Sequence, residues 1–403
     1  MADATSLCPG LICLAPLGQK TIQKSSFQKG VLRSNVVGIK TGNNPVLESG
    51  SIDRFPPIRF AQVMENEEYQ LAPAVRQRVR RKLKTWYDGA ARELPWRATH
   101  DPYRIWISEI MLQQTTVAAV IPYYERFFQA FPHLEDLAQA EEQQVLKLWE
   151  GLGYYSRARN ILKTARLLWR EYEGQFPTDV SGLQELPGIG RYTAGAIVSF
   201  AFDRKAPILE ANTLRLYSRL VGYPGNPRSA DGQRILWNFA EDILSSHSPG
   251  QTNQALMELG SRICTPKEPN CPTCPLNREC RAFAEGTQHE IPHRPERIAL
   301  TDVIEISIAV EKDGAYLLRR RQPGERWAGL WDFPRFELAE TEVNFTDPLA
   351  AGNGRLVNPS LASDASARLQ SLICELTGIQ AETGSFLTEF RHGVTRSRIH
   401  LLC

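Results

Sequence analysis

Four cysteines, the side chains of this protein best suited to bind a metal, stand within one short segment. Cys264, Cys271, Cys274 and Cys280 are separated by six, two and five residues. Thiolates this close together can pair as disulfides, bind zinc or hold an iron–sulfur cluster. Structural zinc sites usually combine two C-x2-C pairs from separate loops, whereas here one loop supplies all four ligands at uneven spacing. The spacing therefore favours a [4Fe-4S] cluster, with zinc and a chance grouping as the alternatives.

A second reactive group is Glu109, in the segment DPYRIWISEIMLQQT. Asp101 followed by Pro102 is a typical helix start, because an aspartate caps the first amides and proline suits the first turn. Apolar neighbours on both sides indicate that Glu109 lies on a partly dry face. Burial raises the pKa of a carboxyl group and suits it to act as a general acid, and a glutamate exposed between apolar stripes is the alternative. The adjacent Gln113 and Gln114 could hydrogen-bond base edges or be ordinary surface side chains.

The segment LQELPGIGRYTAGAIVSFAF predicts two helices joined by a glycine-rich turn. Pro187 ends the first helix, and Gly188 and Gly190 permit a tight turn whose amides face outward. Unpaired amides and the helix dipole at the start of the second helix favour an anion there. The element resembles a helix-hairpin-helix that grips a DNA phosphate, and a plain packing corner is the alternative.

These residues need a scaffold, and the pattern of the whole chain predicts its parts. Residues 1–71 lack helical or strand periodicity and predict a disordered leader, whereas 72–285 repeat apolar residues at helical steps and predict an all-α domain. Residues 286–298 form a proline-containing linker. In 299–403, alternation around an Asp-Gly turn predicts a β-hairpin and RLQSLICELTG predicts a helix, so we expect a smaller α+β domain.

Composition excludes some functions and favours others. No apolar run approaches the roughly 18 residues that a membrane-spanning helix needs, so we expect no membrane partner. The net charge is only +2, but basic residues outnumber acids between Arg76 and Arg104, which suits a polyanion or a solvated helix face. The cysteines outside the quartet show no pairing pattern, which indicates a reducing intracellular compartment.

Several short motifs together resemble those of adenine-specific mismatch DNA glycosylases of the MutY type, within the helix-hairpin-helix/iron–sulfur superfamily. The resemblance covers residues 72–403. In chain order the motifs are LPWR (94–97), SEIMLQQT (108–115), GLGYYSRARN (151–160), LPGIGRYTAGAI (186–197), PILEAN (207–212), NQALMELG (253–260) and the cysteine quartet. The resemblance implies a two-lobed, all-α helix-hairpin-helix glycosylase domain with a [4Fe-4S] loop, followed by a smaller nudix-like domain.

The resemblance also implies a role for each matching residue. Glu109 would protonate the adenine ring, and Gln113 and Tyr154 would enter the base stack around the lesion. Tyr192 stands where related strand-cleaving glycosylases carry a lysine that forms a Schiff base, so a monofunctional enzyme is implied. The other positions expected to contact substrate or DNA are Arg92, Leu94, Trp96, Arg97, Leu112, Gln114, Gly188, Gly190, Asn212 and Gln254.

Glu210 departs from the family pattern, which has an aspartate at that position. Breaking an N-glycosidic bond needs an acid at the base and an anion near the sugar, so Glu210 is the expected second carboxylate. Its extra methylene would move the carboxylate by roughly 1 Å, and we expect it to serve in a shifted pose. A salt-bridging glutamate in the first helical turn is the alternative. The enzyme interpretation requires the carboxyls of Glu109 and Glu210 to face one cleft.

The C-terminal domain departs from the pattern too. WAGLWDFPRFE resembles the nudix-like module that inspects 8-oxoguanine, but only Glu375 stands where a nudix hydrolase would hold Mg²⁺, so nucleotide hydrolysis is not expected. Val394, Thr395 and Arg396 replace the Phe-Ser-His of the family's recognition loop. We also expect this domain to be incomplete at its C-terminal end.

The sequence thus predicts a monomeric, monofunctional DNA glycosylase that removes adenine opposite 8-oxoguanine or guanine from double-stranded DNA. The alternatives are a sister glycosylase with another base preference and a non-catalytic iron–sulfur DNA-binding protein. A pure binder has no need of two carboxylates at positions 109 and 210, which favours an enzyme. We expect it in the cytoplasm, at the nucleoid, of a bacterium, or in the nucleus or a mitochondrion of a eukaryote.

Overall fold

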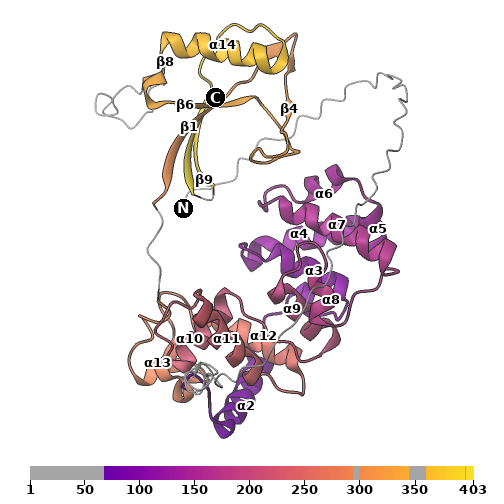
Figure 1. Ribbon diagram of the computed structural model, residues 1–403, viewed down its shortest axis with the longest axis vertical. Helices are drawn as coiled ribbons and strands as arrows, with labels where there is room; N and C mark the ends of the chain where they lie inside the picture. The colour runs from indigo at the N-terminus through magenta and orange to yellow at the C-terminus, as the bar shows by residue number, and fades with distance from the viewer. Residues whose placement is uncertain (1–67, 294–298, 345–359, 395) are drawn as a thin grey trace, which may run out of the picture. The chain divides into compact units, whose positions relative to one another are not determined.

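The computed structural model describes residues 68–293, 299–344, 360–394 and 396–403, so the expected leader lies almost wholly outside the described residues. Helices fill the first of these ranges, and strands with one long helix fill the others (Figure 1). None of the described helices is both long enough and apolar enough to cross a bilayer. The order of helical and mixed parts agrees with the expected fold class.

The helices of residues 68–293 pack around two separate hydrophobic cores, as the expected two-lobed domain requires. The first lobe is built from consecutive elements: η1 (Pro95–Arg97), α3 (Pro102–Met111), α4 (Val117–Ala130), α5 (Leu134–Gln139), α6 (Glu142–Leu148), α7 (Ser156–Glu171), α8 (Val180–Gln184) and α9 (Arg191–Phe202). The second lobe combines α2 (Pro73–Ala90) with α10 (Ala211–Val221), α11 (Ala230–Ile243), α12 (Pro249–Arg262) and α13 (Arg281–Ala284). The chain therefore leaves the second lobe after its first helix and returns to it near Leu209 (Figure 1).

Helix α3 is the buried centre of the first lobe. Every residue of it except Pro102 and Arg104 is buried. Its start is the one that the sequence predicts, because the Asp101 side chain accepts the Tyr103 amide proton at 2.9 Å. A helix that is buried on nearly all sides carries its polar side chains into the interior, and this explains how Glu109 becomes buried.

Helix α12 connects the two lobes. It packs against α2 and α10 of the second lobe and against α9 of the first. Gly260 is where its backbone comes closest to α10, since a Cβ there would lie 2.8 Å from the Asn212 carbonyl oxygen. Residues of α12 therefore lie beside the starts of both α9 and α10, which carry Tyr192 and Glu210.

The C-terminal part contains a four-stranded sheet in the order β6-β1-β10-β9. Strand β1 (Thr301–Ser307) runs parallel to β10 (Ser397–Leu402) and antiparallel to β6 (Arg335–Leu338), and β10 pairs antiparallel with β9 (Glu389–Val394). The predicted helix is α14 (Ser363–Thr377), and its Leu369 shares an apolar core with sheet residues. The remaining strands form two-residue pairs: β2 (Glu311–Lys312) with β3 (Ala315–Tyr316), β4 (Arg319–Arg320) with β5 (Trp331–Asp332), and β7 (Val343–Asn344) with β8 (Ser360–Leu361).

The predicted hairpin is present but shorter than its alternating pattern indicates. Asp313 and Gly314 both have positive φ, 53° and 77°, as a two-residue hairpin turn requires. The apolar alternation before the turn belongs instead to β1, which pairs with β10 and β6. A strand with two partners has more ladder hydrogen bonds than a hairpin arm, so the long-range pairing prevails over the local one.

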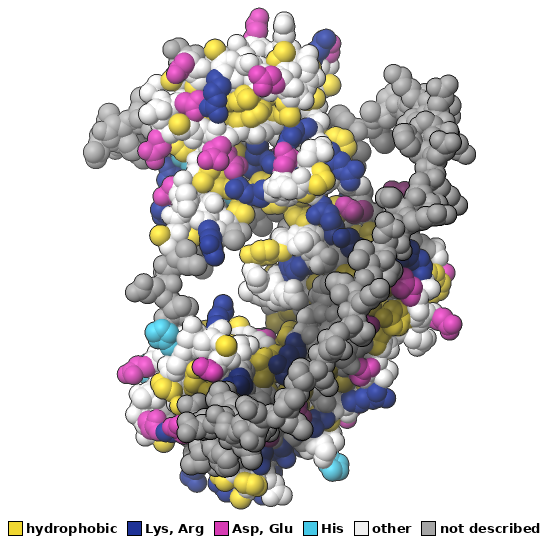
Figure 2. Space-filling view, in the orientation of Figure 1, with side chains coloured by type: hydrophobic (Ala, Val, Ile, Leu, Met, Phe, Trp, Pro, Cys, Tyr) yellow, Lys and Arg dark blue, Asp and Glu magenta, His cyan; other side chains and the backbone are white. Residues whose placement is uncertain are grey.

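The basic excess in α2 is largely consumed within the protein. Arg76 pairs with Asp242, Lys82 binds Glu279 at 2.9 Å, and Arg80 donates to the carbonyl oxygens at the end of α11. Basic and acidic side chains are also interspersed on the face shown in Figure 2. Arg76, Arg80 and Lys82 therefore bind groups of the protein itself, and a polyanion site and a solvated helix face stay the alternatives for the rest of the excess.

Candidate active site

Glu109 lies at the bottom of a cavity of about 630 Å³ between the lobes, with 4% of its surface exposed. Burial raises the pKa of this carboxyl to about 7, and the negative charge of Glu210 acts in the same direction. The Tyr192 hydroxyl donates to Glu109 Oε2 at 2.5 Å and, like the charge of Arg97, opposes the rise. Glu109 is therefore shielded from water, as expected, and near neutral pH about half of the molecules carry it in the protonated form.

Glu210 is the last residue before α10, and it caps that helix. Its Oε2 accepts from the Asn212 amide at 2.8 Å and from the Asn212 side chain at 3.1 Å, and its Oε1 accepts from the Thr213 amide at 2.9 Å. Burial raises its pKa, while these amide hydrogen bonds and the charge of Arg215 favour the anion. The alternative of a salt-bridging glutamate in the first helical turn is wrong, because the longer side chain folds back onto the amides of its own helix.

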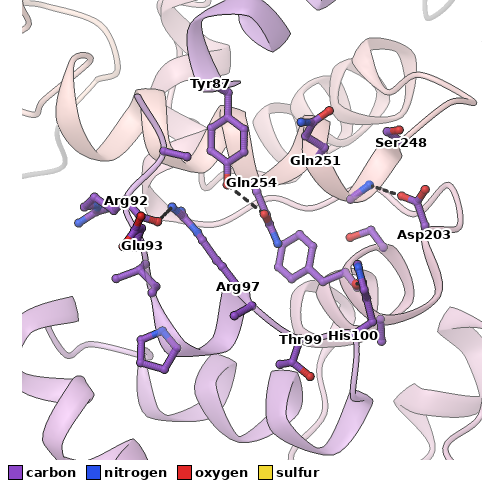
Figure 3. A pocket seen from close by; sticks show the side chains of 18 of the residues that line it. Tyr87, Arg92, Glu93, Arg97, Thr99, His100, Asp203, Ser248, Gln251 and Gln254 are labelled. Atoms are coloured by element: carbon purple, nitrogen blue, oxygen red, sulfur yellow. Dashed lines mark hydrogen bonds between the residues drawn. The ribbon is translucent and has the colours of Figure 1, made fainter. Parts of the chain in front are cut away.

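The cavity brings together most of the residues that the sequence singles out. Both carboxyls line it, so the condition that they face one cleft is met. The other expected residues on its wall are Arg92, Leu94, Trp96, Arg97, Leu112, Gln113, Gln114, Tyr192, Asn212 and Gln254. A larger hollow of about 1120 Å³ adjoins it and shares Arg92, Leu94, Arg97, Phe200 and Gln254 as lining residues (Figure 3). Neither carboxyl lines that hollow, so the smaller cavity is the candidate for chemistry.

Tyr154 lies outside the cavity, with 51% of its surface exposed. Tyr154 and Gln114 both have positive φ, 48° and 59°, a conformation that side chains other than glycine adopt only where their surroundings fix it. Buried Arg157 supplies those surroundings by donating to the carbonyl oxygens of Gln113 and Leu152, which lie in the two loops. One guanidinium therefore holds both loops in place. Sequence reasoning did not single out Arg157, although it lies within the GLGYYSRARN motif.

The glycine turn between α8 and α9 also lies outside the cavity. Gly188 has φ 79°, and a Cβ there would lie 2.8 Å from the Asn160 side chain, so this position requires glycine. Gly190 has an ordinary extended backbone with open space at its Cβ, so the turn itself does not require it. It precedes α9 without a side-chain cap, which leaves the first amides of that helix available to an anion.

The four cysteines of the loop are free thiols that line one small cavity beside α10. Arg219 of α10 donates to Cys264 Sγ at 3.2 Å. Burial raises the pKa of Cys274 to about 12 and that of Cys280 to about 11. Over the described ranges, no three His, Cys, Asp or Glu side chains converge closely enough to hold a single metal ion. Four thiols on the wall of one cavity are the groups that could hold a metal cluster.

Glu258 of α12 is the cavity residue that sequence reasoning missed most clearly. It is fully buried, and its carboxylate accepts from Arg92 Nε at 2.7 Å and from Arg97 Nη2 at 2.8 Å. Its only sequence signal is an acid within the otherwise helical NQALMELG segment. These two hydrogen-bond partners lie more than 160 residues away, so no local pattern predicts them.

Comparisons with known proteins place this site in a family. A family model described as HhH-GPD superfamily base excision DNA repair protein matches residues 107–242, a range that contains Glu109, Tyr192 and Glu210. The adenine DNA glycosylase of Buchnera aphidicola (subspecies Acyrthosiphon pisum) is 39% identical over 258 residues, covering 64% of this chain and 74% of its own. The adenine DNA glycosylase of Mus musculus is 38% identical over 315 residues, which cover 65% of this chain and 61% of the mouse protein. That of Homo sapiens is 39% identical over 266 residues, which cover 64% of this chain and 48% of the human protein. The chain therefore belongs to the adenine DNA glycosylases, enzymes of base-excision DNA repair.

Proposed function

We propose that this enzyme hydrolyses the N-glycosidic bond of adenine mispaired with 8-oxoguanine or guanine in double-stranded DNA. The observation that carries the proposal is the pair of carboxyls, Glu109 and Glu210, on the wall of one cavity. Their surroundings differ in the way that acid and anion roles require. One carboxyl is dry and binds its proton tightly, whereas the other accepts three hydrogen bonds at a helix start.

The reaction begins with extrusion of the adenine from the duplex, which costs a few kcal/mol and less for a mispaired base. Inside the cavity, protonated Glu109 donates its proton to a ring nitrogen of the adenine, so that the base can leave as a neutral molecule. Positive charge then develops on the sugar and is stabilised by the Glu210 carboxylate. Water adds to the sugar, and the Glu109 carboxylate takes up the proton that the water loses. The Tyr192 hydroxyl, which donates to Glu109, holds this acid in place.

The enzyme is proposed to be monofunctional, because Tyr192 stands where a strand-cleaving relative would need a lysine. Burial and the neighbouring carboxyls raise the pKa of Tyr192 far above its ordinary value. The phenol therefore stays protonated and acts as a hydrogen-bond donor to Glu109. Without an amine at this position no Schiff base forms with the sugar, and the strand stays intact until alkali is added.

Cys264, Cys271, Cys274 and Cys280 are proposed to hold a [4Fe-4S] cluster. The free thiols surround one cavity, and Arg219 provides a cation beside thiolates that would otherwise repel one another. When bound, the cluster would cross-link residues 264–280 and replace the protons that burial holds on Cys274 and Cys280. There it would fix the loop against α10, the helix that Glu210 caps.

DNA binding is proposed to use the turn at Gly188 and Gly190, where a phosphate would meet the free amides of α9. Tyr154 and Gln113 are proposed to enter the base stack beside the extruded adenine. Exposure of Tyr154 and the bracing of its loop by Arg157 support this. Tyr154 does not need to move into the cavity for that role, and Gln113 already lies on its wall.

The C-terminal domain is proposed to be a nudix-like module that inspects the base opposite adenine. Its four-stranded sheet with one packed helix supports the assignment. The recognition loop carries Val394 and Arg396 in place of Phe and His, and Thr395 lies outside the described residues. These substitutions favour the second candidate, a sister glycosylase with another base preference.

The test is an assay of free base and of DNA nicks on duplexes with adenine opposite 8-oxoguanine, guanine and thymine. We expect adenine release from the first two, and strand breaks only after alkali treatment. Release of a different base would favour the sister glycosylase. Binding without release of any base would leave only a DNA-binding protein.

A further inference from the structure

The wall of the catalytic cavity contains a third carboxylate, which is buried and which the proposed reaction does not use. Glu258 is 0% exposed, and the Arg92 guanidinium grips it with two nitrogens, Nε at 2.7 Å and Nη2 at 2.8 Å. Arg97 Nη2 binds the same carboxylate at 2.8 Å. Two guanidinium groups sharing one carboxylate form a rigid, planar arrangement rather than a single flexible ion pair.

Both arginines also lie on the wall of the catalytic cavity. Arg97 additionally donates to the Arg92 carbonyl oxygen at 3.2 Å and lies over the Tyr87 ring, whose hydroxyl binds Gln254 (Figure 3). These contacts hold the Arg97 side chain between the lobes. Its charge therefore acts on Glu109 from a fixed place.

The charge balance at this wall depends on Glu258. Arg92, Arg97 and Arg262 all lie within 4 Å of the Glu258 carboxylate, but only Arg92 and Arg97 line the cavity. These two guanidinium groups and the carboxylate leave one net positive charge facing the cavity, and without the carboxylate there would be two. A second cation at this range would favour the ionised form of Glu109 and deplete the proton that the reaction needs. The other groups that act on Glu109 are Tyr192 of α9 and Glu210 before α10, and neither of them contacts the arginines in the described structure.

We propose that Glu258 is a positioning residue that fixes Arg92 and Arg97 and compensates their charge, so that Glu109 remains a proton donor at neutral pH. This deepens the proposed function and rests on Glu109 being its acid. Glu258 touches neither the base nor the sugar in this account and acts only through the two arginines.

The decisive variant is Glu258→Gln, which keeps the size of the side chain and removes its charge. Single-turnover adenine release from an adenine·8-oxoguanine duplex is measured from pH 5 to 9, on the full chain. In the wild type the rate falls as pH rises through the pKa of Glu109, near 7. In the variant we expect this fall about one pH unit lower, so the rate drops roughly tenfold at pH 7.5 and little at pH 5.5. An equal loss at every pH would show a merely structural role and overturn the proposal.

Arg262→Gln is the matched control. Arg262 lies 3.8 Å from Glu258 but is half exposed and does not line the cavity, so its removal should leave the pH profile in place. If Glu258→Gln does not fold, Arg97→Gln tests the same charge balance in the opposite direction. It removes a cation near Glu109, so the fall in the rate of adenine release should move to higher pH. An unmoved profile in Arg97→Gln would then overturn the proposal.

A readout independent of catalysis separates this inference from the proposed function. Titration of the Glu109 carboxyl by ¹³C NMR, without DNA, should show the same downward shift in Glu258→Gln. An inactive wild type whose Glu109 still shifts in the variant would contradict the proposed function alone. An active wild type whose Glu109 does not shift would contradict only the role of Glu258.

Discussion

Each of two sides of the cavity buries a glutamate, but the pKa values of these two carboxyls shift in opposite directions. On the α3 side, Glu109 is 4% exposed and has one hydrogen-bond donor, Tyr192, and burial raises its pKa to about 7. On the α12 side, Glu258 is 0% exposed, yet its pKa lies below the ordinary value because Arg92 and Arg97 outweigh the effect of burial. Burial alone therefore does not decide the charge of a carboxyl. The number of cations that contact the carboxyl decides its charge. In this cavity one glutamate has a raised pKa and the other a lowered one.

The largest effect should come from Glu109→Gln. The substitution keeps the shape of the side chain but removes the proton that the leaving base needs. Single-turnover adenine release should fall by about 10³-fold, the range of a general acid. Duplex affinity, measured in parallel, should stay within a few-fold of wild type. A variant that still releases adenine at a tenth of the wild-type rate would remove Glu109 from the mechanism.

Substitutions of the two glutamates should change the free energy of unfolding in opposite directions. Glu258→Ala leaves two arginines without their shared partner and should cost about 3 kcal/mol, at the lower end for a broken buried pair because a third of Arg92 is exposed. Glu109→Gln should instead stabilise the protein by about 3 kcal/mol at pH 8, because its folded pKa near 7 lies above the ordinary 4.5. The folded state binds that proton more tightly, so wild-type stability falls as pH rises from 4.5 through 7. Urea unfolding at pH 5 and pH 8 measures both effects, and equal destabilisation in the two variants would contradict the comparison.

Glu210→Gln sharpens the distinction between an acid and an anion. The amide can still accept the α10 amide protons through its oxygen, so the helix cap survives in part, but the charge near the sugar is lost. Adenine release should fall by about 10²-fold, and the decline should move to lower pH, because the charge of Glu210 helps to raise the pKa of Glu109. Glu210→Asp restores the charge and should recover most of the rate. Unchanged single-turnover release in Glu210→Gln would reject the role of this residue.

The smallest effect should come from Tyr192→Phe. Its hydroxyl bond to Glu109 lowers the pKa of that carboxyl, so removing it should raise the pKa by about half a unit. The pH profile of adenine release should move upward by the same amount. Tyr217→Phe is a suitable control, because this buried tyrosine belongs to the core of the second lobe and does not line the cavity. A downward shift in Tyr192→Phe would mean that the tyrosine supports the protonated acid instead.

Local sequence patterns predicted much of the side of the cavity that carries Glu109. Asp101 and Pro102 fix the start of α3, and the apolar residues around Glu109 predict its burial. The turn at Gly188 was equally readable, because only glycine fits its positive φ and close contact with Asn160. In each case the decisive neighbours lie within one or two helices of the residue in question.

The opposite side could not be predicted in the same way. The hydrogen-bond partners of Glu258 lie 166 and 161 residues away, and nothing in the NQALMELG motif indicates which residues they are. Strand β1 shows the same limit, since it pairs in parallel with β10, the last strand of the chain. Glu210 is intermediate, because its position before α10 was readable but the return of its side chain onto the Asn212 and Thr213 amides was not.

The most direct test of the account is the pH dependence of single-turnover adenine release by the wild-type chain from an adenine·8-oxoguanine duplex. We predict that the rate is high at pH 6, falls through a midpoint near 7, and leaves an unbroken strand until alkali is added. A rate that rises steadily from pH 6 to 9, or strand breaks that form without alkali, would contradict a buried, protonated Glu109 acting without an amine nucleophile.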